Sequence, residues 1–328
     1  MPKIIDTSIN YNKLINNQIE VPKIENKVHV YHYTSLEGLK GIVENCKIRF
    51  SNIAYLNDKE ELITGIKSYE KVIGYKGNIN ELLRAIEEMS RQIYVCSFSV
   101  EKDDLNLWNY YTKSNNSQGY NIKFNYKELV KSLLKSNQCL DGCQLLYGMV
   151  NYCYKGVSTY SKKLNNNMVF WLKFIEHLLS MDENGKSSDP QVKPPIYKIS
   201  KKEEEKFKVY NFNGAKVTFE DDAMAPHMGF IKNEAFKGEK EFRIAIWIPK
   251  EKLKKINHNI YKFRSCNGVL IPYIELMFVS SAINGIGLSP TTQSDFAKKG
   301  LIDFLEYCGY NGVKNKEFIF ESKVPLRY

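Results

Sequence analysis

The stretch Val28-His29-Val30-Tyr31-His32-Tyr33-Thr34-Ser35 decides how the first part of the chain folds. Its closely spaced β-branched and aromatic residues are typical of a strand. The following Thr34-Ser35-Leu36-Glu37 predicts a capping box that opens a helix. One face of that helix would carry Leu36, Leu39, Ile42, Val43 and Cys46. We therefore expect His32 at the end of a strand and beside a helix N-terminus, where unpaired N–H groups favour anionic oxygens.

The position of His32 allows two interpretations. A His-x-Thr pair in such a position can hydrogen-bond a ribose or a phosphate through His32 and Thr34. Alternatively, His32 is a hydrogen-bonded structural histidine, which is the commoner role of a single histidine. The rest of the sequence has to decide between the two.

Composition limits the partners and the compartment. The chain has 328 residues, 43% of them hydrophobic, and a formal net charge of +10. This charge favours an acidic partner, which is a nucleic acid, a nucleotide or an acidic protein surface. No run of about eighteen apolar residues predicts a membrane span, and the polar N-terminus is unlike a secretory signal. Seven scattered cysteines indicate reduced thiols and a cytoplasmic protein, and their spacing predicts no metal site.

The pattern along the chain predicts an α+β protein. Residues 1–27 form an arm, and 28–328 form one domain with a helical insertion at about 126–235. Strands are expected at 28–33, 47–51, 93–100, 120–124, 145–154, 239–248, 275–279 and 316–322. Helices are expected at 35–45, 57–72, 79–91, 105–111, 127–134, 168–181, 221–235 and 296–307, the last starting near Ser289-Pro290. The proline-containing 183–206 is predicted to be a loop.

The strand at 239–248 carries the most unusual charge pattern. Period-2 geometry places Glu239, Glu241 and Arg243 on one face, while Phe242 and Ile244 point to the other. Two carboxylates and a guanidinium are costly to bury unless they are paired or used. Such a group can tune the pKa of a catalytic carboxylate. The alternative is a solvent-facing edge strand with ordinary surface salt bridges.

A second group of candidates lies between residues 97 and 111. Ser97 and Ser99 share one face of their strand and are candidate cofactor-binding residues. Trp108 and Tyr111 are one helical turn apart and can form an aromatic wall for a flat ring such as nicotinamide or adenine. Core packing is the alternative for Trp108.

These short motifs, in this order, resemble a bacterial family of unknown function known as DUF2971. More distantly, they resemble the ADP-ribosyltransferase superfamily of the diphtheria-toxin type, with its His–Tyr–Glu pattern. The resemblance covers about residues 28–328. The matching residues are Tyr31-His32-Tyr33-Thr34-Ser35, Leu56-Asn57-Asp58-x-x-Glu61, Cys96-Ser97-Phe98-Ser99, Trp108-x-x-Tyr111, Gly119-x-x-Ile122-x-Phe124, Glu239-x-Glu241-x-Arg243 and Ser322-x-x-Pro325-x-Arg327.

The resemblance implies a fold and an NAD site. The fold would be an ADP-ribosyltransferase-like split antiparallel sheet. His32 would bind the adenosine-side ribose of NAD, and Thr34 would act near the nicotinamide ribose. Tyr111 would stack on nicotinamide, with Tyr33, Trp108 or the neighbouring Tyr110 as alternatives.

The resemblance also implies a reaction. Glu241 would hold the nicotinamide ribose and stabilise the oxocarbenium ion that forms as nicotinamide leaves. Glu239 would orient the acceptor nucleophile, and Arg243 would brace the two carboxylates or touch a phosphate. His32, Ser97, Tyr111 and Glu241 would then line one cleft.

The sequence thus favours an NAD-dependent ADP-ribosyltransferase that modifies a macromolecule, with nucleic acid as an acceptor suggested by the net charge. The resemblance alone suggests a bacterial toxin or anti-phage effector. Two alternatives stay open. One is a nucleotide-binding module that has lost transfer. The other is a nucleic-acid-acting protein such as a nuclease, although no clear metal-ligand cluster is visible in the sequence.

Overall fold

The computed structural model describes residues 3–6, 29–56, 90–112, 119–140, 143–153, 207–212, 215–220, 230–266, 268–292, 294–314 and 317–325. Its strands are β1 (Lys3–Asp6), β2 (His29–Ser35), β3 (Lys47–Asn52), β4 (Ile93–Ser99), β5 (Gly119–Asn125), β6 (Gln144–Met149), β7 (Asn151–Cys153), β8 (Phe207–Phe212), β9 (Ala215–Glu220), β10 (Ile231–Asn233), β11 (Glu241–Trp247), β12 (Tyr261–Cys266), β13 (Val269–Met277), β14 (Ile283–Leu288) and β15 (Ile319–Glu321). Its α-helices are α2 (Leu36–Asn45), α5 (Leu105–Tyr111), α6 (Tyr126–Ser136), α10 (Lys250–Leu253) and α11 (Asp295–Tyr307). Its 3-10 helices are η1 (Ile53–Tyr55), η2 (Gln138–Leu140), η4 (Glu234–Glu239), η5 (Ser280–Ala282) and η6 (Asn311–Lys314).

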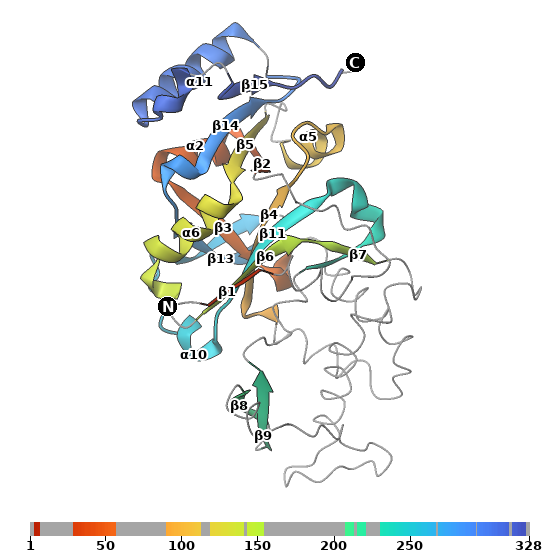
Figure 1. Ribbon diagram of the computed structural model, residues 1–328, viewed down its shortest axis with the longest axis vertical. Helices are drawn as coiled ribbons and strands as arrows, with labels where there is room; N and C mark the ends of the chain where they lie inside the picture. The colour runs from red at the N-terminus through yellow and green to blue at the C-terminus, as the bar shows by residue number, and fades with distance from the viewer. Residues whose placement is uncertain are drawn as a thin grey trace.

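The protein is a mixed α+β structure built on a largely antiparallel, unclosed sheet (Figure 1). The main path runs β1-β6-β11-β4-β2-β5-β14-β15, and β3, β13 and β12 branch from it. Along this path only the β1–β6 and β14–β15 pairs are parallel. Two further pairs, β7–β10 and β8–β9, lie outside the main sheet.

The sheet divides at β4. One edge of β4 pairs with β11 from Ser99 opposite Glu241 to Ile93 opposite Trp247. The other edge is shared, because β3 pairs at residues 94–95 and β2 pairs only at Ser99. One branch therefore continues into β3, β13 and β12, and the other into β2, β5, β14 and β15. Ser97 lies on this divided edge, between the two pairings.

The two faces of the sheet have different coverings. The main core packs on the side of α2, α6 and α11, which contribute buried leucines including Leu39, Leu133 and Leu305. The other face carries two smaller clusters, one around Ala245 and Trp247 and one where α5 packs Trp108 on β2. In Figure 1, α2 and α6 lie to the left of the sheet and α5 to the right.

The alternation expected for β11 is confirmed, but its setting is not an exposed edge. Phe242 and Ile244 enter the main core, and Ala245 enters the smaller cluster on the opposite face. The strand is buried along its whole length because β4 and β6 flank it. The alternative of a solvent-facing strand is therefore wrong. Glu239 precedes the strand, in η4, rather than lying within it.

Other boundaries also differ from the expectation. The N-cap of α2 is Ser35, whose hydroxyl accepts a hydrogen bond from the Gly38 N–H, so the expected capping box at Thr34 is shifted by one residue. The N-cap of α11 is Ser294, later than expected from Ser289-Pro290. Residues 231–233 are a strand and not the end of a helix.

The segment 126–235 contributes strands as well as helix. Its described part begins with α6 and continues into β6, which is a member of the main sheet. Within the expected arm, residues 3–6 pair with β6 as β1. The predicted helices at 57–72 and 168–181 and the predicted loop at 183–206 lie outside the described residues, as does nearly all of the helix predicted at 79–91. Within the described residues, no helix has the length and apolar character needed to cross a membrane.

Candidate functional site

A buried ionic cluster lies at the start of β11. Glu241 is 3% exposed and Arg243 2%. Arg243 Nε lies 2.5 Å from Glu241 Oε1, and Arg243 Nη2 lies 3.0 Å from Oε2. The guanidinium thus binds the carboxylate through two parallel hydrogen bonds, the strongest geometry available to this pair. Alternation brings the two side chains together, because residues i and i+2 of a strand share a face.

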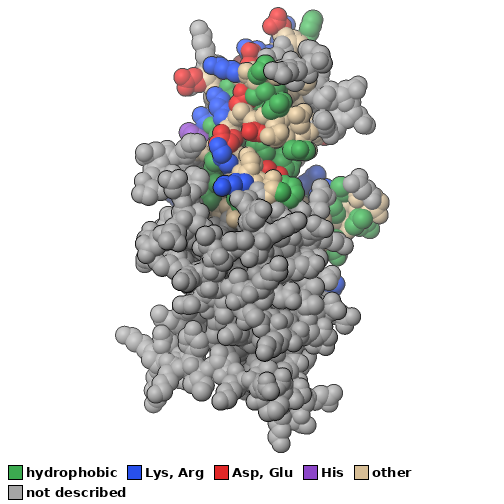
Figure 2. Space-filling model, turned by 90° about the vertical axis from the view of Figure 1, so that its right-hand side faces the viewer, with side chains coloured by type: hydrophobic (Ala, Val, Ile, Leu, Met, Phe, Trp, Pro, Cys, Tyr) green, Lys and Arg blue, Asp and Glu red, His purple; other side chains and the backbone are tan. Residues whose placement is uncertain are grey.

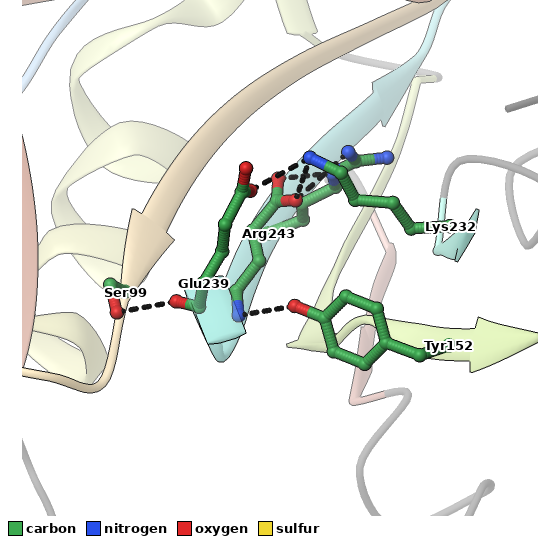
Figure 3. Close-up of polar contacts among 6 residues, drawn as sticks. Ser99, Tyr152, Lys232, Glu239 and Arg243 are labelled. Atoms are coloured by element: carbon green, nitrogen blue, oxygen red, sulfur yellow. Dashed lines mark hydrogen bonds and ion pairs between the residues drawn. The ribbon is translucent and has the colours of Figure 1, made fainter. Parts of the chain in front are cut away.

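Lys232 on β10 connects both acidic residues (Figure 3). Its Nζ lies 2.8 Å from Glu239 Oε2 and 3.3 Å from Glu241 Oε2. Glu239 can approach because the backbone turns at Lys240, which has a positive φ of 42°. That turn is held by the Val100 N–H, which donates to the Lys240 carbonyl. Glu239, Glu241 and Arg243 therefore lie close together, as the sequence predicted, and Lys232 joins them.

The cluster keeps Glu241 ionised. Burial alone would raise the pKa of Glu241, but the neighbouring cations Arg243 and Lys232 outweigh burial and hold the pKa below its usual value. The Ser97 hydroxyl adds a hydrogen bond to the same carboxylate. A carboxylate offers about four acceptor positions. Two bonds from Arg243, one from Lys232 and one from Ser97 fill them, and the Lys232 contact is the longest of the three with a measured distance.

Three further hydroxyls surround the cluster. The Ser99 hydroxyl donates to the Glu239 carbonyl at 2.7 Å and accepts from a backbone N–H, so it holds the chain leading into β11. The Tyr152 hydroxyl accepts from the Glu241 N–H at 2.7 Å. Tyr111 on α5 lies within hydrogen-bonding reach of Glu239, and burial and that carboxylate raise the pKa of its phenol. Tyr111 is nevertheless 46% exposed, so one part of it faces solvent.

His32 reaches the cluster indirectly. Its Nδ1 lies 2.9 Å from the carbonyl of Ser97, the residue whose hydroxyl binds Glu241. A carbonyl can only accept, so Nδ1 carries the proton. Burial holds the pKa of His32 below its ordinary value, so the ring is neutral at pH 7 and Nε2 is an acceptor. The His32 ring packs on Phe98, 5.5 Å between centroids, on the face of β4 opposite Ser97. The structure brings Ser97, Tyr111 and Glu241 together, but it places the His32 ring on the opposite face of β4, where His32 contacts only the backbone carbonyl of Ser97. The expectation that all four side chains line one cleft is therefore wrong for His32.

The expected aromatic wall is smaller than the sequence suggested. Trp108 is 4% exposed, its Nε1 donates to Asp103, and its ring packs edge-on against Tyr33 at 4.8 Å. Tyr33 is 8% exposed, and its hydroxyl donates to the Glu101 carbonyl. Both rings are core residues, so the stacking role expected of Trp108 or Tyr33 is wrong. Tyr111 and the more exposed Tyr110 have the accessible rings.

Sequence reasoning missed Lys232 and Tyr152. Both come from β7 and β10, a short parallel pair whose partners are about eighty residues apart in the chain. A three-residue strand carries too little periodicity to be recognised, and nothing local marks a lysine as buried. The available signal was indirect: two predicted buried carboxylates with one arginine require a further cation.

Thr34 lies beside α2, where its Oγ1 would be 2.0 Å from a Cβ at Gly38, so that position requires glycine.

Within the described residues, no group of three or more His, Cys, Asp or Glu side chains is arranged to hold a metal ion. Comparisons with protein-family models, with curated proteins and with solved structures find no significant match to this chain.

Proposed function

We propose that this protein transfers ADP-ribose from NAD to a macromolecule and that its sheet corresponds to the ADP-ribosyltransferase fold. The observation that carries the proposal is the order of three adjacent strands at the divided sheet. β2 brings His32, β4 brings Ser97, and β11 brings the buried, ionised Glu241. A His–Ser–Glu sequence across neighbouring strands, with a tyrosine on the intervening helix, fits the pattern that the sequence resembles.

The geometry supports a definite role for each residue. The bond between nicotinamide and C1′ of the ribose breaks, nicotinamide leaves as the neutral base, and positive charge develops on the sugar. The Glu241 carboxylate would stabilise that charge electrostatically. Glu239, within reach of Tyr111, would orient the acceptor nucleophile that bonds to C1′. His32 would act as a positioning residue, because its Nδ1–H binds the carbonyl of Ser97, whose hydroxyl binds Glu241.

Glu241 can bind substrate only after one of its donors moves. The Lys232 ammonium has the longest measured contact, 3.3 Å, and already holds Glu239 more closely at 2.8 Å. Lys232 can therefore release Glu241 without becoming unpaired. Arg243 would stay on the carboxylate and keep it ionised. The effector role, as a toxin or an anti-phage protein, follows from the sequence resemblance only.

A second candidate function is a nucleotide-binding module without transfer. The filled acceptor positions of Glu241 favour it, because a carboxylate saturated by protein donors is also what a structural ion cluster requires. Both candidate functions predict that the protein binds NAD, but only the transferase predicts turnover of NAD.

The deciding experiment incubates the purified protein with adenylate-labelled NAD and a cell extract, and separates label on macromolecules from free label. We expect labelled product from the wild type and none above background from Glu241→Gln. Glu275→Gln is the matched control, because Glu275 is also a paired carboxylate, bound by Lys262 and Arg49 on the β12–β13–β3 branch. Binding of NAD without any turnover would instead select the inactive module.

A further inference from the structure

Lys123 occupies an unusual position for a lysine. It lies on β5, which is flanked by β2 and β14, and its register partners are Tyr31 on β2 and Gly285 on β14. Its neighbours Ile122 and Phe124 enter the main core, so Lys123 points to the opposite face, which also carries Tyr31. The side chain is only partly exposed, whereas most lysines lie at the surface.

The ammonium group of Lys123 lacks an anionic partner. Among the described residues, no carboxylate forms an ion pair with it and no acceptor receives a hydrogen bond from it. Burial and then the neighbouring Lys102 lower the pKa of Lys123, and together they outweigh Glu317, which raises it. Gly285 beside it on β14 contributes no side chain. Partial burial of this cation therefore costs free energy that nothing in the described structure offsets.

Lys102 is held near Lys123 by an aromatic ring. Its Nζ lies 4.3 Å from the centre of the Phe320 ring, which is a cation–π contact. Phe320 also packs edge-on against Tyr31, 6.4 Å between centroids, and covers Gly287 of β14, where a Cβ would lie 2.4 Å from the ring. Tyr31 is paired with Lys123, so the phenol, the Phe320 ring and both lysines lie on one face of the sheet.

The carboxylates around these lysines are bound elsewhere. Glu101 pairs with Lys240 at 2.7 Å, Glu321 pairs with Lys298 at 2.8 Å, and Asp103 accepts three hydrogen bonds. Figure 2 views the molecule from the side of α5 and shows acidic and basic side chains interleaved over the described part. General positive charge therefore does not distinguish the two lysines; the lack of a carboxylate partner does.

We propose that Lys102, Lys123 and the Tyr31 hydroxyl form a binding site for a terminal phosphate group, either inorganic phosphate or a phosphate monoester. The hydroxyl can donate, because it has no hydrogen-bond partner in the described part of the chain. A phosphate monoester carries a charge of about −1.5 to −2 at pH 7, which matches two lysines. Each phosphate of NAD carries a single negative charge and is esterified on both sides, so it matches less well.

The proposed phosphate site is separate from the Glu241 cluster. The register runs from Glu241 to Ser99, from Ser99 to Tyr31 and from Tyr31 to Lys123. Three strand spacings therefore separate Glu241 from Lys123, about 14 Å between their Cα atoms. The two sites share no residue, and the proposal goes beyond transfer of ADP-ribose and does not depend on it.

The test is calorimetric titration of the full-length protein, without NAD, with inorganic phosphate. We expect Lys123→Met and Lys102→Met each to weaken binding by about 10- to 150-fold, the loss of one hydrogen bond to a charged group. Without phosphate, Lys123→Met should raise the thermal midpoint, because it removes a cation whose burial is not compensated. Phosphate should raise the thermal midpoint of the wild type and not that of Lys123→Met.

The matched control is Lys262→Met, which makes the same charge change on a partly exposed strand lysine that pairs with Glu275 at 2.6 Å. It should bind phosphate like the wild type. Equal loss in Lys262→Met would show diffuse attraction and overturn the proposal, as would the absence of binding at millimolar phosphate. Ribose 5-phosphate is the second probe: if it displaces phosphate, the ligand is a monoester, and if it does not, the ligand is the free ion. Displacement of phosphate by NAD would overturn the proposal, because the site would then hold the pyrophosphate of NAD.

Discussion

Replacing Glu241 by Gln tests the catalytic proposal, and the structure predicts two separate losses. Gln keeps the size of the side chain but removes a charge that faces Arg243 and Lys232, both nearly fully buried. Breaking a buried pair by removing one partner costs about 3–5 kcal/mol. We therefore expect the thermal midpoint to fall by about 5–10 °C. Gln has nearly the same shape as Glu, which alone would suggest unchanged stability. Because the lost charge is buried, we expect the variant to be less stable than the wild type.

The second loss is in turnover. Removing one preorganised electrostatic contact to the developing oxocarbenium should lower kcat by about 10²–10³-fold. Affinity for NAD should change much less, because Tyr111 is untouched. Loss of transition-state stabilisation with little loss of ground-state binding is the mark of a catalytic group. The assay is NAD turnover per folded molecule, at a temperature where both proteins are fully folded, with NAD affinity measured by calorimetry.

Lys232→Met separates the two losses. It also breaks buried ion pairs, so it should lower the thermal midpoint comparably, but it leaves the Glu241 carboxylate on Arg243. It opens the acceptor position that substrate needs, so turnover per folded molecule should be retained. If Glu241→Gln and Lys232→Met lose stability equally and Glu241→Gln keeps its turnover per folded molecule, Glu241 is a structural partner of Arg243. The proposed mechanism would then be wrong.

Three further outcomes are expected. Glu239→Gln should keep NAD hydrolysis while transfer to the acceptor falls, as product analysis would reveal; equal loss of both reactions would contradict the orienting role. The stabilisation by Glu241 is complete above the unfolded carboxyl pKa of about 4.3 and is lost as the pH falls through its lower folded pKa. Wild type should therefore lose thermal stability below about pH 4 more steeply than Glu241→Gln, and parallel pH curves would refute this. Trp108→Phe should lower the thermal midpoint by removing the hydrogen bond to Asp103 and leave NAD affinity unchanged; weaker NAD binding at unchanged stability would restore Trp108 as a stacking residue.

Local patterns predicted the elements that lie nearest the site. The alternation of Phe242 and Ile244 with Glu241 and Arg243 fixes the two faces of β11, because side chains of a strand alternate regardless of its neighbours. The same pattern could not show whether β11 lies at an edge or in the centre of the sheet. That depends on β6, which pairs with it from about a hundred residues earlier in the chain.

Two features of the structure were not predicted from the sequence, the β12–β13 hairpin and the burial of Lys232. The β12–β13 hairpin has a recognisable signal, since Asn267-Gly268 is the preferred pair for a two-residue hairpin loop and Gly268 has a positive φ of 76°. Lys232 has no such signal, because its burial results from long-range pairing. The cap of α2 is an intermediate case, since Thr34 and Ser35 are both suitable caps and local sequence does not distinguish them.

The C-terminal segment helps to hold the aromatic residues of α5 in place. The Asp103 carboxylate accepts hydrogen bonds from Trp108 Nε1, from the Ser322 hydroxyl and from the Lys323 N–H. One side chain thus ties the start of α5 to the segment that follows β15. Tyr111 is one helical turn beyond Trp108, so its position next to Glu239 depends on this attachment. The terminal Ser-x-x-Pro and the Trp-x-x-Tyr patterns, far apart in the sequence, therefore act together as a support that holds the site tyrosine against the acidic pair.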